Sequence, residues 1–225
     1  MTINTPNNPQ QKKNEWLTED RVIEYLDRAD RLPHRLEGES VLLEHIPVGT
    51  NRILDLGTGN GRLIRLLKNN NKNLNIVEAI GLDFSSLMIK KAREEFSKDP
   101  SVKIIEHDLN NSLFPKLNCE KFDVVVSSFA IHHLEHQRKL ALYKEIFSIL
   151  NSGGIFCNLD HVSSPSPQLH KRFMAMLGKT PETEDSSNKL LDLHTQLEWL
   201  KTIGFIDVDC YWKWLEFALL IGVKP

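Results

Sequence analysis

Three glycines at alternate positions follow an aspartate that ends a short apolar run. Asp55 is followed by Gly57, Thr58, Gly59 and Gly61. Glycine lets the backbone turn sharply, and because it has no Cβ a ligand can approach the main chain closely. The unpaired N–H groups at the start of the helix that follows carry a partial positive charge and attract an anionic or strongly polar ligand. The pattern predicts the first strand, turn and helix of a nucleotide-binding sheet.

Two more aspartates come at the ends of predicted strands. Asp83 ends a strand in a position where its carboxylate can accept hydrogen bonds from both hydroxyl groups of a ribose, and Asp108 ends the next strand. Dinucleotide-binding enzymes also use an acidic residue at the position of Asp83. Their glycine spacing, however, is G-x-G-x-x-G, whereas the third glycine comes one residue earlier here. The glycine spacing favours a nucleotide other than a dinucleotide.

Histidine and aspartate side chains follow the fourth and fifth predicted strands. His132 and His133 come after the fourth strand, and Asp160 and His161 end the fifth. An imidazole is a good general base near neutral pH, and His133 is the best placed of the four to act as one. His136 lies one helical turn beyond His132, but no carboxylate or cysteine group completes a metal site, so no metal is expected.

Strands and helices alternate through the middle of the chain. Three consecutive valines within Phe122–Ser127 are typical of a strand that is buried on both faces. Gly153 and Gly154 are expected to stop the helix before them. The predicted strands are Arg52–Leu56, Ile76–Asp83, Val102–Asp108, Phe122–Ser127 and Ile155–Asp160, and the predicted helices are Gly61–Asn69, Ser85–Ser97 and Glu135–Leu150. This alternation predicts a parallel, doubly wound sheet.

The two ends of the chain add to this sheet. Residues 1–14 are polar and are predicted to be a disordered tail, and residues 15–225 to form a single domain. Within that domain, residues 15–48 carry two helical patterns and are predicted to form an N-terminal helical lid. Residues 161–193 break the alternation and are predicted to be an insertion near the mouth of the site, since ligands of such sheets bind beside the carboxyl ends of the strands.

The last two predicted strands, Phe205–Tyr211 and Glu216–Val223, are separated by only a few residues. So short a connection requires an antiparallel hairpin. The predicted fold is therefore α/β, with a doubly wound, mostly parallel seven-stranded sheet, a C-terminal antiparallel strand and additional N-terminal helices.

These features, in this order, resemble the class I S-adenosylmethionine-dependent methyltransferases, which have a seven-stranded, Rossmann-like fold. The likeness is strong from Arg52 to Leu159 and looser in the hairpin. In that family the glycine turn holds the methionine part of the cofactor, the second-strand aspartate binds the ribose, and residues after the third and fourth strands contact the adenine and the amino group. The resemblance implies that S-adenosylmethionine is bound by Asp55, Gly57, Thr58, Gly59, Gly61, Asp83, Phe84, Met88, Asp108, Leu109, Ser127 and Phe129.

The segment after the fourth strand bears on the acceptor. Family members that methylate exocyclic amines carry N-P-P-Y there, whereas this chain has Ser127-Ser128-Phe129-Ala130. The following Ile131-His132-His133-Leu134 resembles the branch that methylates small molecules, which implies in-line transfer to a small organic metabolite. Basic residues among the acceptor candidates would suit an anionic group such as a carboxylate. The residues expected to bind the acceptor are Tyr25, Arg31, His34, Arg35, Trp212 and Glu216.

Composition limits the alternatives. The formal net charge of −2 gives no reason to expect non-specific attraction to nucleic acid. No apolar run is long enough to span a membrane, the N-terminus has no signal-peptide core, and three widely separated cysteines indicate a reducing cytoplasm.

Two other functions stay open. One is an RNA-modifying methyl- or carboxymethyltransferase that acts on tRNA, because Gly204-Phe205 and Lys224 are loosely like the ending of the wobble-uridine carboxymethyltransferases. The other is a non-catalytic, regulatory S-adenosylmethionine-binding protein. The sequence leaves open the oligomeric state and whether O, N or C is methylated.

Overall fold

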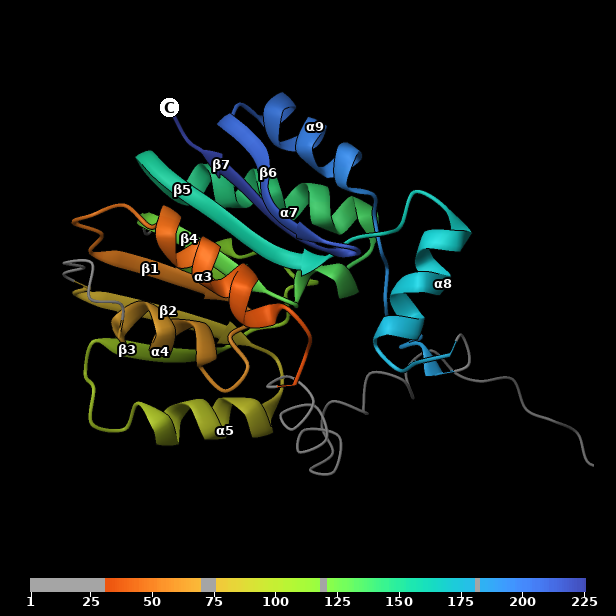
Figure 1. Cartoon of the computed structure of the whole chain (residues 1–225). Coiled ribbons are helices and arrows are strands. Elements are labelled where there is room, and N and C mark those ends of the chain that lie inside the picture. The colour runs from red at the N-terminus through yellow and green to blue at the C-terminus, as the bar shows by residue number, and fades with distance from the viewer. Residues whose placement is uncertain (1–30, 70–75, 118–120, 181–182) are drawn as a thin grey trace, which may run out of the picture.

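The computed structural model describes residues 31–69, 76–117, 121–180 and 183–225. The strands within these ranges form one seven-stranded sheet in the order β3-β2-β1-β4-β5-β7-β6 (Figure 1). β1 to β5 are parallel to one another, and β7 is antiparallel to both β5 and β6. The strands are β1 Arg52–Leu56, β2 Glu78–Asp83, β3 Val102–Glu106, β4 Phe122–Ser128, β5 Leu150–His161, β6 Ile206–Trp214 and β7 Phe217–Val223. The predicted fold is confirmed.

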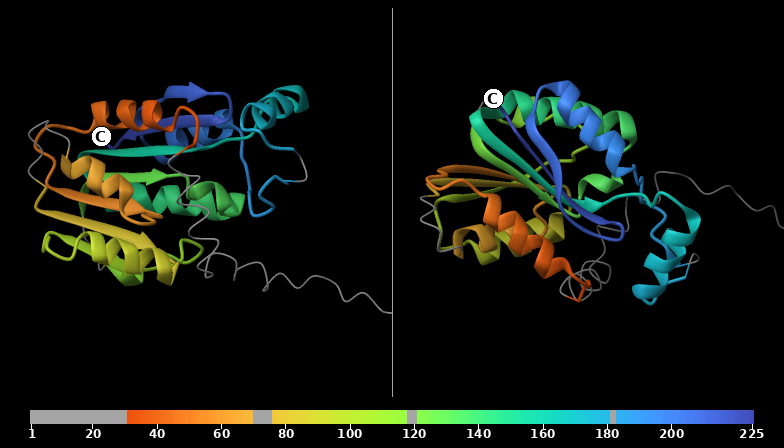
Figure 2. Two further views of the ribbon diagram at one scale, coloured as in Figure 1. Left: turned by 60° about the horizontal axis from the view of Figure 1, so that its bottom comes forward. Right: turned by 45° about the horizontal axis from the view of Figure 1, so that its top comes forward.

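Helices cover both faces of this sheet (Figures 1 and 2). Val124 and Val126 of β4 pack with α3, α4 and α5 on one face, whereas Val125 packs with α7 and α9 on the other. Both faces are buried, which explains the uninterrupted apolar run. The helices are α3 Arg35–His45, α4 Arg62–Asn69, α5 Ser86–Glu95, α6 Phe114–Leu117, α7 His136–Ile149, α8 Pro167–Met176 and α9 Leu193–Ile203, with a 3-10 turn η2 at Ile131–His133.

The predicted tail at residues 1–14, the first of the two N-terminal helices and Tyr25 lie outside the described residues. The second N-terminal helix is α3, which packs on the sheet. A Cβ on Gly38 would come within 2.9 Å of Leu159 in β5 and of Trp212 in β6, so glycine is needed for this close approach. Trp212 lies within β6 and packs against α3, although the predicted strands, Phe205–Tyr211 and Glu216–Val223, had left it in the connection between them. The corner of the hairpin is at Leu215 and Glu216.

The prediction that Gly153 and Gly154 stop a helix was wrong. α7 ends at Ile149, and both glycines lie inside β5. There the pairing of β4 with β5 shifts register, and the positive φ of Gly153, 76°, accommodates the extra residues. The Gly153 N–H donates to the Lys224 carbonyl at 2.8 Å, and the Lys224 N–H donates to the Gly154 carbonyl at 2.8 Å. The glycines therefore join the start of β5 to the end of the chain.

The chain leaves the sheet after β5 and returns at α9. The Ser163 N–H donates to the Leu191 carbonyl at 3.1 Å, and Ser163 forms a parallel bridge with Asp192, so the two ends of the excursion lie side by side. Between them α8 lies beyond the carboxyl end of β5 (Figure 1). No described helix is both long and apolar enough to cross a membrane.

Candidate active site

The glycine turn joins β1 to α4 and has positive φ at each of its three glycines. The φ angles are 71° at Gly57, 55° at Gly59 and 81° at Gly61. A Cβ would lie 2.2 Å from the Ala130 Cβ at Gly57 and 2.4 Å from the Phe96 ring at Gly61, but it would meet nothing within 4 Å at Gly59. The outer glycines therefore let the turn pack against its neighbours, whereas Gly59 presents bare backbone to open space.

Two buried aspartates support this turn. The Thr58 hydroxyl donates to Asp55 Oδ2 at 2.7 Å, and the Gly59 N–H donates to Asp83 Oδ2 at 2.8 Å. The Ser85 N–H donates to Asp83 Oδ1 at 2.8 Å, at the start of α5. Burial raises the pKa of Asp55 to about 7, although the Thr58 hydroxyl opposes this, and burial also raises the pKa of Asp83. A cationic ligand beside the turn would favour the ionised form of both.

The predicted adenine side of the site follows β2 and β3. Phe84 is 42% exposed next to Asp83, and Met88 is buried on α5. Asp108 Oδ1 accepts from the Asn110 N–H at 2.9 Å and from the Asn110 side chain at 2.8 Å, and Leu109 is buried. Phe84 and Met88 follow the carboxyl end of β2 and Asp108 and Leu109 follow that of β3, and because the two strands are parallel these ends lie at the same edge of the sheet.

The end of β4 supplies backbone and hydroxyl groups. The Ser127 hydroxyl donates to the Leu56 carbonyl at 2.8 Å, which ties β4 to β1. The hydroxyl of Ser128 is buried and has no hydrogen-bond partner among the described residues. Phe129 adopts a left-handed conformation with φ 54°. A buried polar group without a partner is costly, so Ser128 indicates that a polar ligand group is held here.

His132 and Asp160 form a buried pair at the ends of η2 and β5. His132 Nδ1 lies 2.6 Å from Asp160 Oδ1, and both residues are less than a tenth exposed. Burial opposes ionisation of Asp160, but the charge and hydrogen bond of His132 hold the pKa of that carboxyl below its usual value. The ionised carboxylate therefore accepts the Nδ1 proton and leaves Nε2 of His132 as a base.

His161 and Glu216 form a second such pair. His161 Nε2 lies 2.8 Å from Glu216 Oε2, and Glu216 is fully buried. Glu216 Oε1 also accepts from the Ser164 hydroxyl and lies 2.9 Å from His170 Nδ1 of α8. Burial opposes ionisation of Glu216, yet these donors keep its pKa below its usual value. Burial lowers the pKa of His161, so its ring is neutral at neutral pH.

His133 is a third histidine in the same cluster. Its ring lies 4.0 Å from that of His132, and its Nδ1 lies 3.0 Å from the Ser187 hydroxyl, which donates to Asp185 at 2.6 Å. Burial, followed by the neighbouring His132, lowers the pKa of His133 to about 3. His133 is therefore a neutral hydrogen-bonding side chain at neutral pH.

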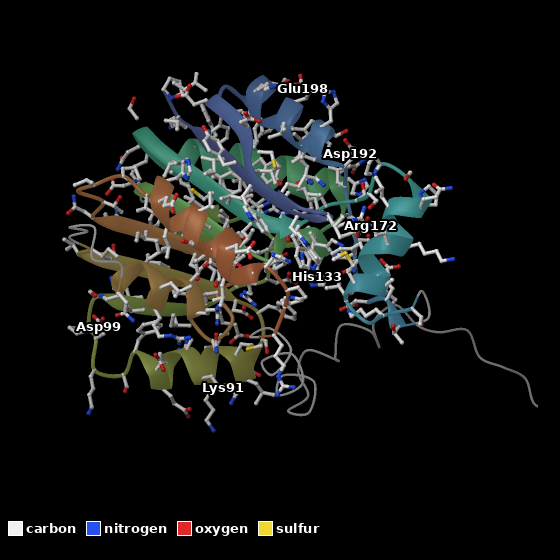
Figure 3. The ribbon with its side chains drawn as sticks, viewed as in Figure 1. Lys91, Asp99, His133, Arg172, Asp192 and Glu198 are labelled. Carbon is white, nitrogen blue, oxygen red and sulfur yellow. The ribbon has the colours of Figure 1, made fainter. Side chains whose placement is uncertain are left out.

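These histidines line a cavity of about 80 Å³ between the sheet and the insertion, where His133 lies beside α8 (Figure 3). Rings from both sides form its apolar part. The lining residues named above are Phe129, His132, His133, His161 and Asp185, and they are joined by Leu32, Phe173, Met174, Leu177, Lys179, Glu184, Asn188 and Phe217. Among the described residues no group of three or more histidine, cysteine or acidic side chains is arranged to hold a metal ion.

The predicted basic acceptor-binding residues do not line this cavity. His34 lies 2.8 Å from Glu37 and stacks on Trp214, and Arg31 is exposed. Arg35 pairs with Glu39 at 2.8 Å. The predicted basic residues therefore do not support an anionic acceptor in this cavity, where the lysine or arginine among the described lining residues is Lys179.

The chain is similar in sequence and in fold to known methyltransferases and related enzymes. Residues 53–154 match the family model described as a methyltransferase domain. A carboxy-S-adenosyl-L-methionine synthase of Nautilia profundicola is 24% identical over 81% of this chain and 81% of its own. An O-methyltransferase family protein of Burkholderia thailandensis has a TM-score of 0.70 at 14% identity over 95% of this chain, and human N-acetylserotonin methyltransferase, solved with S-adenosylmethionine, has 0.67 at 16% over 98%. This chain covers less than two thirds of those two, 63% and 60%.

Residues 53–154 carry a methyltransferase domain, and the chain shares the fold of these solved methyltransferases. The protein is an enzyme with a methyltransferase domain. The glycine turn and the aspartates after β2 and β3 have the placement that this methyltransferase class implies for its cofactor.

Lys139 is a residue of this methyltransferase that the sequence analysis missed. Its buried Nζ donates to the carbonyls of His132, Leu134 and Lys189, which ties η2 to the insertion. Burial lowers the pKa of Lys139 to about 8. The helical spacing could have predicted this burial. Lys139 lies three residues before Leu142 and four before Tyr143, and therefore on the buried face of α7.

Proposed function

We propose that the protein transfers the methyl group of S-adenosylmethionine to a small organic molecule by in-line displacement, with His132 as the general base. The observation that carries this proposal is the buried His132–Asp160 pair, whose histidine ring lines the cavity together with Phe129. Phe129 precedes Ala130, against which the glycine turn packs at Gly57. A hydrogen-bonded carboxylate fixes which ring nitrogen keeps the proton and stabilises the imidazolium that forms. The other ring nitrogen is left to accept a proton from the acceptor.

The residues of the turn fit the cofactor. Gly59 offers open space where a side chain would intrude, and Ser128 offers a buried hydroxyl without a protein partner among the described residues. We propose that Asp83 binds the ribose and that Asp108 and Leu109 contact the adenine. The bound sulfonium supplies an activated methyl group, so the protein need only orient the acceptor, exclude water and remove one proton.

His132 then carries the proton step. As the new bond between acceptor and methyl carbon forms and the bond from carbon to sulfur breaks, the acceptor proton passes to His132 Nε2. The positive charge lost at sulfur appears on the imidazole, beside the buried carboxylate of Asp160. The phenyl rings around the cavity keep water away from the reacting atoms.

The test is transfer of labelled methyl groups from S-adenosylmethionine to a fractionated metabolite extract and, separately, to total RNA. Label is expected in a small molecule, and His132→Asn should reduce the rate by about 100-fold or more. His136→Asn is the matched control, because His136 is exposed one helical turn further along. Label in RNA alone, or full activity of His132→Asn, would overturn the proposal.

A second candidate follows from the relatives. Several, at 22% to 26% identity, share the name carboxy-S-adenosyl-L-methionine synthase, so this protein is a candidate for making the carboxylated cofactor. A carboxylate-bearing reactant would need a cation, and among the described cavity residues Lys179 is the one lysine or arginine. Mass spectrometry of nucleosides extracted from the purified protein separates the candidates, since carboxylated S-adenosylmethionine is expected only if the second is right.

A further inference from the structure

Two histidines of the cavity are held in the same way by buried carboxylates. Nδ1 of His132 forms a hydrogen bond with Asp160, and Nε2 of His161 forms one with Glu216. Within the described residues, the hydrogen bonds of these two rings use only those nitrogens, and both rings line the cavity. One pair serves the proton step proposed above, so the second needs a separate explanation.

Burying the carboxylate of Glu216 costs free energy that its surroundings must offset. Its side chain has no exposed surface, and it lies in the turn between β6 and β7, where a polar residue would ordinarily face solvent. Three donors, from His161, Ser164 and His170, compensate for its burial. Of these, the His161 ring is the one that lines the cavity, and the hydrogen bond to Glu216 makes Nδ1 the acceptor nitrogen.

The two rings are close enough to bind one molecule together. Their centroids lie 5.8 Å apart, so one small molecule that carries two hydrogen-bond donors close together can reach both rings. The cavity of about 80 Å³ has room for roughly five to eight waters at about 10–15 Å³ each, which is enough for the polar edge of a small molecule. Phe129, Phe173 and Phe217 provide apolar walls.

We infer that His161, positioned by Glu216, holds a second polar group of the acceptor, so that the acceptor is a small neutral compound with two adjacent hydroxyl groups on a flat apolar body. His132 takes the proton of the hydroxyl that is methylated, and His161 accepts a hydrogen bond from the other. The inference rests on the proposed function, because it assigns the second hydroxyl within the same site.

The test compares the binding of catechol and phenol by calorimetry, with S-adenosylhomocysteine present. Catechol is expected to bind at least about fivefold more tightly, since phenol leaves the second ring nitrogen without a donor. His161→Phe should remove this preference, and His161→Asn, which keeps an acceptor oxygen near the place of Nδ1, should restore part of it. His194→Phe is the control, because His194 is an exposed histidine on α9.

Equal affinity for the two probes, or no binding of catechol, would overturn the inference. If His161→Phe does not fold, the wild-type comparison still decides, together with the nitrogen NMR signals of His161. Those signals should show a neutral ring that is protonated at Nε2 and shift at Nδ1 when catechol is added. Binding of catechol without methyl transfer would count against the proposed function alone, and methylation of both probes without preference would count against this inference alone.

Discussion

Replacing Glu39 with glutamine tests whether α3 holds the glycine turn in place. Glu39 is 2% exposed, and its Oε1 accepts from Arg35 Nε and from Arg62 Nε, each at 2.8 Å. Its Oε2 accepts from Arg62 Nη2 at 2.9 Å. Arg62 is the first residue of α4, directly after Gly61. The carboxylate therefore links α3 to the end of the turn that we propose holds the cofactor.

The expected cost follows from the burial of this group. Removing one partner of a buried ion pair costs about 3–5 kcal/mol, and because glutamine keeps one acceptor oxygen we expect a loss of about 3 kcal/mol in the free energy of unfolding at pH 7. Burial opposes ionisation of Glu39, but Arg62 and Arg35 hold its pKa below the usual 4.5. A carboxyl with a lowered pKa stabilises the fold above 4.5 and loses this effect as pH falls through its folded value. The difference between the two proteins should therefore shrink below pH 4.5.

Urea unfolding at several pH values measures this difference, with Glu44→Gln as the control. Glu44 is exposed on the same helix, so its replacement should change stability by less than about 0.5 kcal/mol. Calorimetry with S-adenosylhomocysteine should show weaker binding to Glu39→Gln alone. A loss below about 1 kcal/mol, or one that stays constant from pH 7 to pH 4, would refute the reasoning.

Four further substitutions probe the site. Asp160→Asn should reduce the rate of methyl transfer by about 100-fold or more while leaving S-adenosylhomocysteine affinity unchanged, and an equal loss of both would contradict a role in the proton step. Gly57→Ala should lower the melting temperature strongly because its Cβ would lie 2.2 Å from that of Ala130, whereas Gly59→Ala should chiefly weaken cofactor binding. Asp55→Asn should stabilise the protein without cofactor by about 4 kcal/mol at pH 8, because a buried carboxyl whose pKa is raised to about 7 costs stability as pH rises. Urea unfolding at pH 5 and pH 8 checks the sign.

Local pattern was enough to predict the sheet. The three valines of β4 pack alternately on two helical layers, which is why they form an unbroken apolar run. The pattern failed at Gly153 and Gly154 for a physical reason. Glycine ends helices, but it also relieves crowding where a strand shifts register, and the two uses look the same in sequence. Only the pairing of Gly153 with Lys224, 71 positions away in the chain, distinguishes them.

The candidate site residues that directly follow a strand could be predicted from the sequence. The hydrogen-bonded pairs that these side chains form with one another could not. His132 and Asp160 were both recognised as candidates, but nothing in the sequence joins them across 28 positions. Lys139 was missed because a lysine is normally a surface residue, and its burial is stabilised by three carbonyls that the folded loops bring to it. The residue types therefore predicted acid–base chemistry, whereas the fold determines which side chains or carbonyls each of these residues contacts.

The direction of β7 explains why Glu216 belongs to this site. Ligands of parallel sheets bind at the carboxyl ends of the strands, so residues that precede a strand ordinarily lie at the opposite edge. β7 runs antiparallel to β5 and pairs Phe217 with His161, which brings its first residues to the edge where β5 ends. Glu216 therefore reaches His161 because the last strand is reversed; a parallel strand would have placed Val223 there. We infer that the reversed strand does more than close the sheet, because it supplies the carboxylate that orients the second histidine of the acceptor cavity.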